Sequence, residues 1–281
     1  MQTGILAVNL NLPLAFARCE EACLGTVGKA ISLLDLFSVD EPELGLGEIA
    51  RRSEFDKATT RRLLVSLAQH GFVEQDAETR HYRLGAGLTR LARIREARLP
   101  FLQTALPFIR ELAAETAETV HLSEAGNGSL LTVHVEHPAR ANRVNVNVGE
   151  YLPLHSTASG VAFLAHVREP VLTSALARPL KAYTRRTITD PAAVMAAIEA
   201  ARKRGYSTSD QGYEEGVFSV GAAILGADGY ALGTLAVAAP LTRTSRSIAA
   251  ERGKAVAAAA RGISEQLNGE VFNALKGRAL A

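Results

Sequence analysis

Cationic and hydroxyl-bearing side chains gather between residues 57 and 62, in the sequence Lys-Ala-Thr-Thr-Arg-Arg. An Arg guanidinium can donate two parallel hydrogen bonds to N7 and O6 of a guanine, and a Thr offers a hydroxyl and a methyl group. Backbone N–H groups at the start of a helix suit a phosphate. These residue types are suited to contacting a DNA groove, and the expected contact residues are Lys57, Ala58, Thr59, Thr60, Arg61 and Arg62.

Four further arginines are candidates for holding the phosphate backbone beside that surface. Arg51 and Arg52 precede it, and Arg80 and Arg83 follow it in a polar stretch that also contains His81. Phosphate contacts fix the position of a protein on DNA without reading its sequence. A merely solvated surface is the competing interpretation for each of these cations.

The placement of charge decides between these interpretations, because the net charge does not. Residues 26–85 hold eight Lys and Arg against ten Asp and Glu, and the whole chain carries a formal charge of only +2. Acidic residues dominate 35–48, whereas 58–70 contain none. This segregation favours a nucleic-acid surface that is confined to one helix edge.

The apolar spacing indicates which elements position these cations. Three stretches with helical spacing are followed by two short stretches that alternate with period two, as in a β-hairpin. Three helices and a hairpin within about 60 residues are typical of a winged helix-turn-helix. The expected helices cover 27–37, 46–52 and 57–70, and the expected strands cover 72–74 and 81–84.

The third of these helices has recognisable ends and a recognisable buried side. Asp56 is a plausible N-cap, and Gly71 stands where helices favour a left-handed residue. The buried stripe is expected to comprise Leu63, Leu64, Leu67 and Ala68.

The second half of the chain mixes helices and strands. A helix with Leu88, Leu91 and Ile94 on one side is expected over 87–98, followed by another over 101–117. The alternation of Val and Asn over 144–148 predicts a strand with one wet face, and so an antiparallel or mixed sheet. With an Ala-rich helix near 247–267, the fold class is α+β.

The expected domain boundaries follow from these elements. Residues 1–25 are an N-terminal extension, 26–85 the winged helix-turn-helix, 86–104 a linker helix region, 105–270 a second domain and 271–281 a C-terminal tail.

Composition excludes several classes of protein. With 47% hydrophobic and 21% charged residues the chain is an ordinary globular one, and its longest apolar stretch, 5–16, is too short and too polar to span a membrane. That stretch also lacks the preceding cations of a secretory signal, so a cytoplasmic location is expected. Cys19 and Cys23 have no partners that would complete a metal site. No cofactor, metal or catalytic residue is expected.

Together these segments resemble the isocitrate lyase regulator (IclR) family of transcriptional regulators, over about residues 26–270. The resemblance implies a winged helix-turn-helix joined by a linker helix to a GAF-like α/β domain that binds an effector. The fragments that carry it are Val27-Gly28-Lys29-Ala30, Glu48-Ile49-Ala50, Thr60-Arg61-Arg62-Leu63-Leu64, Gly71-Phe72-Val73, Tyr82-Arg83-Leu84-Gly85, Leu154 to Gly160, Thr187-Ile188-Thr189-Asp190, Glu215-Gly216-Val217 and Leu235 to Pro240.

The resemblance further implies an effector pocket in the second domain. The hydroxyls near the start of a helix at 155–160 are suited to a carboxylate, although each is as well suited to a structural cap. Asp210 is more suited to orienting a ligand hydroxyl or capping N–H groups than to contacting an anion. The implied residues are His155, Ser156, Thr157, Ala158, Ser159, Ser209, Asp210, Ser219, Ala236 and Ala238.

Three departures from the family pattern bear on the effector. Val161 stands where the family often has Lys, Gln211-Gly212 stands where an acidic pair is common, and Ala236 and Ala238 are small. Fewer polar anchors and smaller walls suggest an organic acid that is bulkier and less polar than a two-carbon or three-carbon keto acid.

Other functions remain open from the sequence. His155, Ser156, Asp210 and Ser219 contain the residue types of a nucleophilic triad, but no Gly-x-Ser-x-Gly elbow accompanies them. The winged domain is alternatively a protein-docking module. For a DNA regulator the expected partners are double-stranded operator DNA, a small carboxylate and a second copy of the chain, as a dimer or tetramer, because such proteins read two half-sites.

Overall fold

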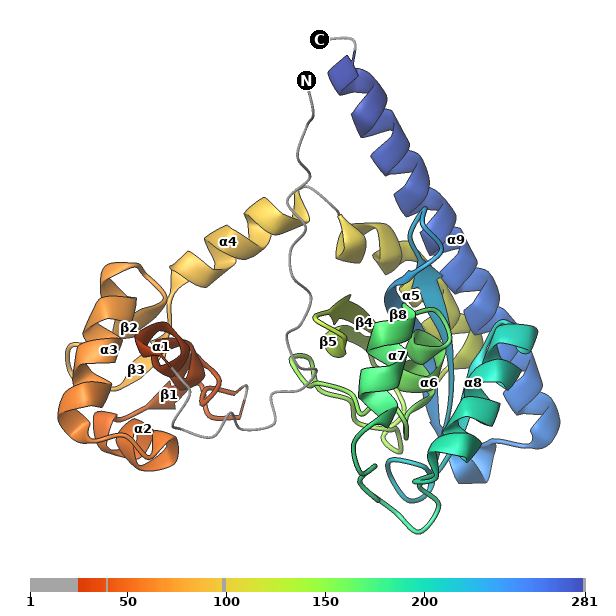
Figure 1. Cartoon of the computed structure of the whole chain (residues 1–281), viewed down its shortest axis with the longest axis horizontal. Coiled ribbons are helices and arrows are strands. Elements are labelled where there is room, and N and C mark those ends of the chain that lie inside the picture. The colour runs from red at the N-terminus through yellow and green to blue at the C-terminus, as the bar shows by residue number, and fades with distance from the viewer. Residues whose placement is uncertain (1–24, 39, 98–99, 280–281) are drawn as a thin grey trace. The chain divides into compact units, whose positions relative to one another are not determined.

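The computed structural model describes residues 25–38, 40–97 and 100–279 and divides into two compact units (Figure 1). One unit ends at residue 99 and the other begins at residue 100. The residues expected to form an N-terminal extension, including Cys19 and Cys23, lie outside the described residues apart from Gly25. No helix in the described ranges has the length and apolar character needed to cross a membrane.

The N-terminal unit contains the three helices and the hairpin that the sequence predicts, followed by a fourth helix. The first helix is shorter than expected, and a short strand precedes the second helix. The elements are α1 (Thr26–Leu34), β1 (Glu43–Leu44), α2 (Leu46–Ser53), α3 (Lys57–Gln69), β2 (Val73–Gln75), β3 (Tyr82–Leu84) and α4 (Ala86–Glu96).

The ends of α3 are set by local chemistry. The Asp56 carboxylate accepts a hydrogen bond from the Thr59 N–H at 2.8 Å, as an N-cap should, and these bonds lower the pKa of Asp56. At the other end Gly71 has φ +72°, the left-handed conformation that glycine adopts without strain. Three residues separate α2 from α3, which is the tight turn of a helix-turn-helix.

The core of this unit corrects one detail of the expected stripe on α3. Leu63, Leu64 and Leu67 are buried, but Ala68 is exposed and Thr60 takes the fourth buried position. Positions 60, 63, 64 and 67 share a helix face at 3.6 residues per turn. The core also contains Leu33 of α1, Ile49 of α2, Val73 of β2 and Tyr82 of β3.

The wing is a three-stranded antiparallel sheet in the order β1-β3-β2. The strand β1 could not be predicted from the sequence, because two residues are too few to show a period. The strand β1 pairs with β3, with Glu43 opposite Arg83 and Leu44 opposite Tyr82. The segment before α2 therefore belongs to the sheet of the wing.

Three glycines join the wing to α4. The Gly87 N–H donates to the Gly71 carbonyl oxygen at 2.8 Å, and the Gly85 N–H donates to the Phe72 carbonyl oxygen at 2.8 Å. A Cβ on Gly85 would collide with the Gly71 carbonyl group, and a Cβ on Gly87 would lie 2.7 Å from the same oxygen. The backbones approach so closely that only glycine fits.

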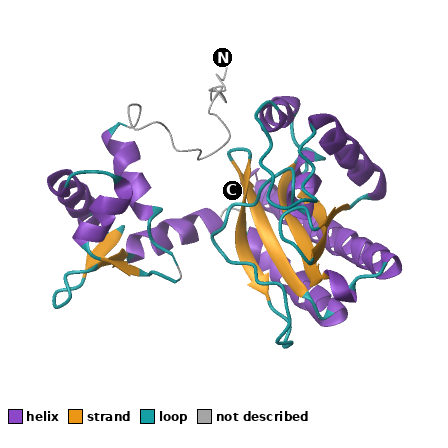
Figure 2. Ribbon diagram, turned by 90° about the horizontal axis from the view of Figure 1, so that it is seen from below, coloured by secondary structure: helices purple, strands orange, loops and turns teal. Residues whose placement is uncertain are grey.

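The C-terminal unit is an antiparallel sheet with helices on both faces, in the order β5-β4-β8-β7-β6 (Figure 2). The helix α5, whose first turn was expected to belong to the linker region, is part of this unit. Its elements are α5 (Phe101–Thr116), β4 (Thr119–Gly126), β5 (Ser129–Glu136), α6 (Ala158–Leu164), α7 (Glu169–Leu176), α8 (Pro191–Arg204), β6 (Ser207–Asp210), β7 (Val217–Leu225), β8 (Ala231–Pro240), a 3₁₀ turn (Leu241–Arg243) and α9 (Arg246–Ala279).

The alternation along β7 separates the two faces of the sheet. Gly221 faces α6, since a Cβ there would lie 3.0 Å from the backbone of Ala158 and Ser159. Val220 and Ala222 therefore point to the other face, which α5 and α9 cover. The side occupied by α6 and α8 is the one that holds the cavity described below.

Two expectations for this unit were wrong. Residues 144–147 form no strand; they run as an extended loop with Val144 buried, and the Thr119 hydroxyl donates to the Val144 carbonyl oxygen at 2.7 Å. The helix α9 also continues to Ala279, so the expected tail is in large part a continuation of that helix.

A buried carboxylate fixes the base of this loop to the end of the sheet. Glu118 is 1% exposed and receives two hydrogen bonds from Arg243, at 2.9 and 2.7 Å, and one from Arg252 at 3.0 Å. Arg243 also donates to the Asn142 carbonyl oxygen at 2.9 Å. The ion pairs thus connect α9, the end of β8 and the loop that leads to Val144.

Candidate functional site

The N-terminal half of α3 presents unpaired cations. Lys57, Arg61 and Arg62 are exposed, and within the described part of the chain no side chain forms an ion pair with them. Ala58 is exposed beside them and Thr59 is half-buried. The core of the unit lies on the opposite side of the helix, so this edge is available to a groove.

Thr60 does not belong to that edge. Its side chain is fully buried, and its hydroxyl donates to the Asp56 carbonyl oxygen at 2.9 Å. We therefore correct the expectation for Thr60: it packs in the core and supports the first turn of α3.

The two arginines of α2 are engaged with carboxylates. Arg52 donates to both oxygens of Glu41, at 2.6 and 2.7 Å, and to Glu48, while Arg51 donates to Glu48 at 2.6 and 3.0 Å. These bonds lower the pKa of Glu48 to about 2. Much of the positive charge of Arg51 and Arg52 is therefore compensated within the domain.

The two arginines of the wing differ from each other. Arg83 pairs with Glu74 at 3.3 Å and with Glu43 at 3.8 Å. Arg80 lies at the turn with φ +62°, is exposed, and has no ion-pair partner in the ranges that the structure describes. Arg80 is thus the wing cation whose charge is free.

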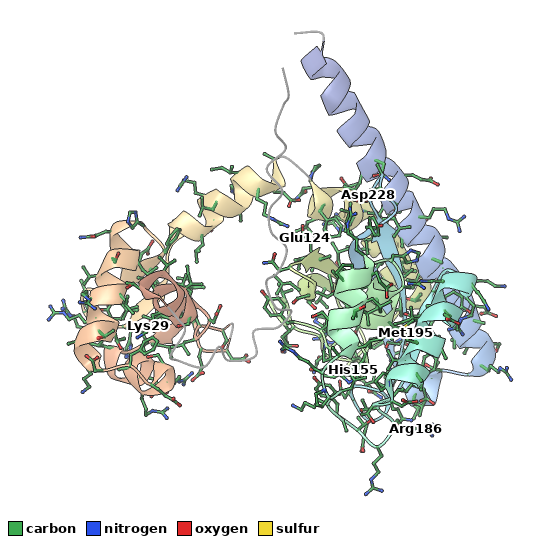
Figure 3. The ribbon with its side chains drawn as sticks, in the orientation of Figure 1. Lys29, Glu124, His155, Arg186, Met195 and Asp228 are labelled. Carbon is green, nitrogen blue, oxygen red and sulfur yellow. The ribbon has the colours of Figure 1, made fainter. Side chains whose placement is uncertain are left out.

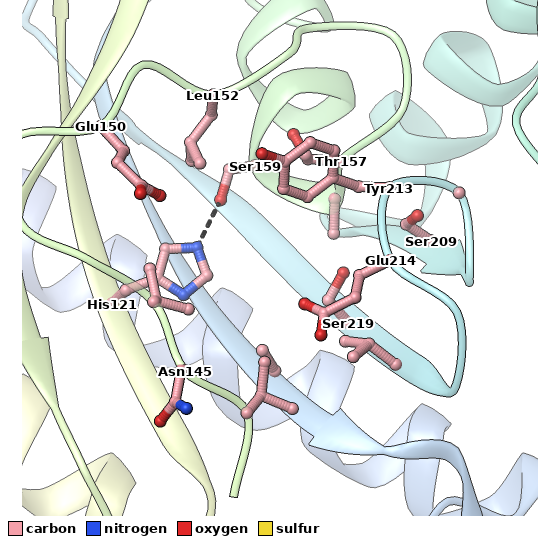
Figure 4. Close-up of a pocket in the computed structure, with 16 residues that line it drawn as sticks. His121, Asn145, Glu150, Leu152, Thr157, Ser159, Ser209, Tyr213, Glu214 and Ser219 are labelled. Atoms are coloured by element: carbon pink, nitrogen blue, oxygen red, sulfur yellow. Dashed lines mark hydrogen bonds between the residues drawn. The ribbon is translucent and has the colours of Figure 1, made fainter. Parts of the chain in front are cut away.

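The C-terminal unit contains a pocket between the α6 side of the sheet and the loops that follow β5 and β6 (Figure 4). Its empty space amounts to about 580 Å³, of which the open mouth is a part. Six of the ten residues implied from the sequence lie in its wall, namely Thr157, Ala158, Ser159, Ser209, Ser219 and Ala238.

The hydroxyls in this wall have different roles. Thr157 is a structural N-cap, because its hydroxyl accepts from the Gly160 N–H at 2.9 Å and donates to the Pro153 carbonyl oxygen at 2.7 Å. Ser209 donates to the Ser156 carbonyl oxygen at 2.7 Å. Ser159 and Ser219 are the two serines of the wall whose hydroxyls are not held by backbone in the described residues.

Four of the implied residues lie outside the wall. His155 Nε2 donates to the Lys181 carbonyl oxygen at 2.9 Å, and Asp210 pairs with Arg186 at 3.3 Å. Figure 3 shows His155 and Arg186 at the same end of this unit. Ser156 and Ala236 are buried away from the pocket. No hydrogen bond in the described residues joins His155, Ser156 and Asp210, so the residue types of a triad are not assembled.

Ten of the sixteen residues of the wall were not named as site residues from the sequence. Its further polar members are His121, Asn145, Glu150, Tyr213 and Glu214. Tyr213 and Glu214 lie within the stretch 209–219 that the resemblance implied as part of the pocket, and the alternation over 144–148 was interpreted as a strand. The apolar members are Val144, Val146, Leu152 and Val217, with Gly212 beside them.

His121 is the buried polar group of the pocket. It is 6% exposed, its Nε2 lies 3.2 Å from the Ser159 hydroxyl (Figure 4), and its Nδ1 has no hydrogen-bond partner in the part of the chain that the structure describes. Burial lowers its pKa to about 4, so the imidazole is neutral at pH 7. A neutral ring offers one donor and one acceptor. His121 and Ser159 therefore form a buried polar pair in the wall of the pocket.

The charged members of the wall are acidic. Glu150 and Glu214 are both exposed side chains of the lining, whereas the lining residues include no Lys or Arg. Glu150 accepts a hydrogen bond from Asn147 at 2.8 Å, which leaves its second oxygen available. No cluster of His, Cys, Asp and Glu in the described ranges is suited to a metal ion.

Comparison with known proteins gives matches in both units. The family model for the IclR helix-turn-helix domain matches residues 26–77, and the model "Bacterial transcriptional regulator IclR C-terminal" matches residues 97–265. The glycerol operon regulatory protein of Streptomyces coelicolor is 32% identical over 247 residues, which are 87% of this chain and 96% of that protein.

Solved structures show the same similarity. A putative IclR transcriptional regulator from Silicibacter sp. TM1040 superimposes with a TM-score of 0.78 at 39% identity, over 87% of this chain and 96% of that one. An IclR homologue from Microbacterium hydrocarbonoxydans, solved with 4-hydroxybenzoate, has the same fold, with a TM-score of 0.77 at 24% identity over 87% and 100% of the chains. With its helix-turn-helix domain and its pocketed α/β domain, this chain belongs to the IclR family of bacterial transcriptional regulators.

Proposed function

We propose that this regulator binds operator DNA through Lys57, Arg61 and Arg62 and that a small organic acid bound in the C-terminal pocket controls it. The observation that carries the proposal is the presence of a cationic helix edge without ion pairs among the described residues in one unit and of a pocket lined by hydroxyl and apolar side chains in the other. The finer parts of the proposal are the contact residues, the effector class and the oligomeric state.

The charge distribution of the winged domain supports the contact residues. Arg51, Arg52 and Arg83 already have carboxylate partners, whereas the α3 cations and Arg80 have none in the described residues. Each phosphate that a Lys or Arg of the protein neutralises releases a counterion from the DNA, and a cation already paired with a carboxylate is less available for this. We therefore assign the base-reading role to α3 and a phosphate-holding role to Arg80.

The pocket supports an acid with one carboxylate and an apolar body. Ser159 and Ser219 offer hydroxyls to that carboxylate, and Val144, Val146 and Val217 offer apolar contact. Glu150 and Glu214 disfavour a second carboxylate because like charges repel, and they accept hydrogen bonds from a ligand hydroxyl. The 4-hydroxybenzoate of the Microbacterium hydrocarbonoxydans structure belongs to that protein, but it has this general chemistry.

A second copy of the chain is the third proposed partner. Leu91 and Ile94 of α4 are 42% and 60% exposed, and a protein with one reading helix needs a second one to occupy two half-sites. Sedimentation equilibrium at micromolar concentration should give a dimer or larger. A monomer, both alone and with operator, would overturn this part of the proposal.

A gel-shift assay with the gene's own upstream region tests DNA binding. Arg61→Ala should weaken binding by about 1–3 kcal/mol if it reads a base, that is, by about five- to 150-fold. The matched control is Lys254→Ala, an exposed cation of α9 in the other unit, which should bind normally. Unchanged binding by Arg61→Ala would remove α3 as the reader.

Adding ligands to the same assay tests the effector. Benzoate, 4-hydroxybenzoate, glyoxylate and pyruvate would be compared by thermal shift and by their effect on the gel shift. We expect the aromatic acids to bind and the two keto acids not to bind. Binding of the keto acids alone would contradict the proposed ligand class.

The salt dependence of binding separates DNA recognition from docking of another protein. If DNA is the partner, log K should fall by about 0.9 per phosphate contact for each log unit of salt. A winged domain that docks a protein instead would show no steep loss of DNA affinity, because it would have no specific DNA affinity to lose.

A further inference from the structure

The pocket loop between β6 and β7 is held by a segment that does not itself line the pocket. Residues 181–187, here called the strap, lie between α7 and α8 and contact the loop 210–214 through two threonine hydroxyls. We propose that the strap sets the selectivity of the pocket by fixing Tyr213, with Thr187 as the positioning residue. This inference rests on the proposed role of the pocket.

Thr187 makes the central connection. Its hydroxyl accepts hydrogen bonds from the Tyr183 and Thr184 N–H groups, both at 2.9 Å, and donates to the Gly212 carbonyl oxygen at 2.7 Å. Thr184 donates in parallel to the Gln211 carbonyl oxygen at 2.6 Å. One hydroxyl thus closes the turn of the strap and ties it to the residue next to Tyr213.

The loop needs these hydrogen bonds because its backbone adopts an uncommon conformation and is closely packed. Gln211 has φ +58°, which a non-glycine residue adopts only when its surroundings enforce it. A Cβ on Gly212 would lie 2.6 Å from the Ser156 carbonyl oxygen and 2.7 Å from the Ser209 hydroxyl. The chain at 211–212 is therefore pressed against the segment before α6 from one side and held by the strap from the other.

Aromatic packing carries the connection to the pocket wall. The Tyr183 ring of the strap meets the Tyr213 ring edge to face, with 5.1 Å between centroids and 67° between planes. The His155 ring lies 6.0 Å from Tyr183, and its Nε2 anchors the strap at the Lys181 carbonyl oxygen. His155, which the sequence suggested as a ligand contact, holds the strap instead.

Tyr213 is the residue through which the strap affects the selectivity of the pocket. It is the aromatic member of the wall, and it is 42% exposed, so its ring is fixed by contacts and not by burial in a core. Releasing the strap should let the ring move and should widen the range of acids that the pocket accepts. The strap acts through Tyr213 and does not touch the ligand.

The chain contains no Trp, so a Trp introduced at one position is the single indole of the protein. Its fluorescence tests the inference without a ligand. In a Tyr213→Trp background, the single indole reports the pocket wall by its emission maximum and by acrylamide quenching. Thr187→Val, which keeps the shape but loses the hydroxyl, should red-shift the emission and raise the quenching constant. Thr187→Ser should restore both, since it keeps the hydroxyl. The matched control is Thr189→Val, an exposed threonine without a hydrogen bond in the described residues.

The ligand readout uses benzoate, 4-hydroxybenzoate and pyruvate without the Trp substitution. Thr187→Val should reduce the ratio of the affinities for 4-hydroxybenzoate and pyruvate, and Thr187→Ser should preserve it. If Thr187→Val fails to fold by circular dichroism, Thr184→Val provides the same comparison at the second tie.

The two proposals fail in different ways. If the wild-type chain binds none of the acids, the proposed effector class is wrong, while the quenching comparison still decides whether the strap fixes residue 213. Equal quenching constants for Thr187→Val and Thr187→Ser would overturn the inference even if every acid binds.

Discussion

His121 shows what burial does to a single titratable side chain in the pocket. Among the described residues its ring hydrogen-bonds only to Ser159, and it carries no charge at pH 7 because burial lowers its pKa to about 4. The sequence offered no way to find it. A lone His in a strand has no spacing pattern, and its neighbour Ser159 is 38 residues away along the chain.

The lowered pKa of His121 predicts a loss of stability in mild acid. An unfolded His has a pKa near 6.5, so between about pH 6.5 and pH 4 the unfolded chain binds a proton that the folded chain does not. The free energy of unfolding should then fall as the pH falls, by up to about 1.4 kcal/mol per pH unit from this group. Chemical denaturation at pH 6.5 and 4.5 measures the difference.

The variant His121→Gln should reduce that difference, since an amide does not titrate. His70→Gln, at an exposed position on the C-cap of α3, is the control and should leave the difference unchanged. An unaltered pH dependence in His121→Gln would show that carboxylates alone account for the acid sensitivity.

The acidic residues of the pocket wall lead to a prediction about ligand affinity. Glu150→Gln removes a negative charge from the pocket lining. Because two unit charges about 4 Å apart in water interact by about 1 kcal/mol, the affinity for benzoate should rise, by up to about fivefold. Isothermal titration calorimetry measures it, with Glu199→Gln, an exposed glutamate of α8, as control. Weaker binding of benzoate by Glu150→Gln would contradict this repulsion.

At the scale of elements, a helix or strand could be predicted from the sequence where its apolar residues recur with a clear period and its ends are marked by capping residues. The helix α3 has both, with Asp56 before it and Gly71 after it. The strand β1 was missed because two residues carry no period. The segment 144–148 was predicted wrongly as a strand, because it forms a loop without strand pairing in which three successive residues, Val144, Asn145 and Val146, all line the pocket.

Because the arginines of α2 are paired with carboxylates, we expect them to contribute less to DNA binding than the unpaired cations of α3. Lys57→Ala should lower the slope of log K against log salt by about 0.9 if Lys57 neutralises one phosphate. Arg51→Ala should change it much less, because Glu48 already compensates Arg51. Fluorescence anisotropy over a salt series measures both slopes. Equal losses of slope would mean that DNA displaces Glu48 from Arg51.

At the scale of the whole molecule, the two units can respond to mutation separately. Arg243→Ala leaves the buried Glu118 with Arg252 alone. Breaking a buried ion pair by removing one partner costs about 3–5 kcal/mol, and the remaining arginine should keep the loss near the lower figure. Chemical denaturation should show the C-terminal unit unfolding earlier, with the N-terminal transition unmoved.

Arg246→Ala serves as the control, because Arg246 is exposed at the start of α9 and has no ion pair in the described residues. A loss below about 1 kcal/mol for Arg243→Ala would show that the network behaves like a surface pair. The network could not be foreseen from the sequence, since Glu118 and Arg252 are 134 positions apart.

The two-domain organisation, in contrast, was accessible from the sequence, because each domain has local signals of its own. The full set of residues that line the pocket could not be predicted, because they come from five separate stretches of the chain between His121 and Ala238. The family resemblance located the six of its sixteen residues that lie at 157–159, 209, 219 and 238.

The contact between Gly71, Gly85 and Gly87 has a consequence for how this protein tolerates change. These positions lie at the end of α3, after the wing and at the start of α4, where connecting segments usually accept substitution. Here every possible side chain at 85 or 87 meets the carbonyl group of Gly71. In a saturation mutagenesis library, both positions should therefore be as depleted of variants as Leu64 in the core, and the first turn of α4 should evolve as part of the winged domain.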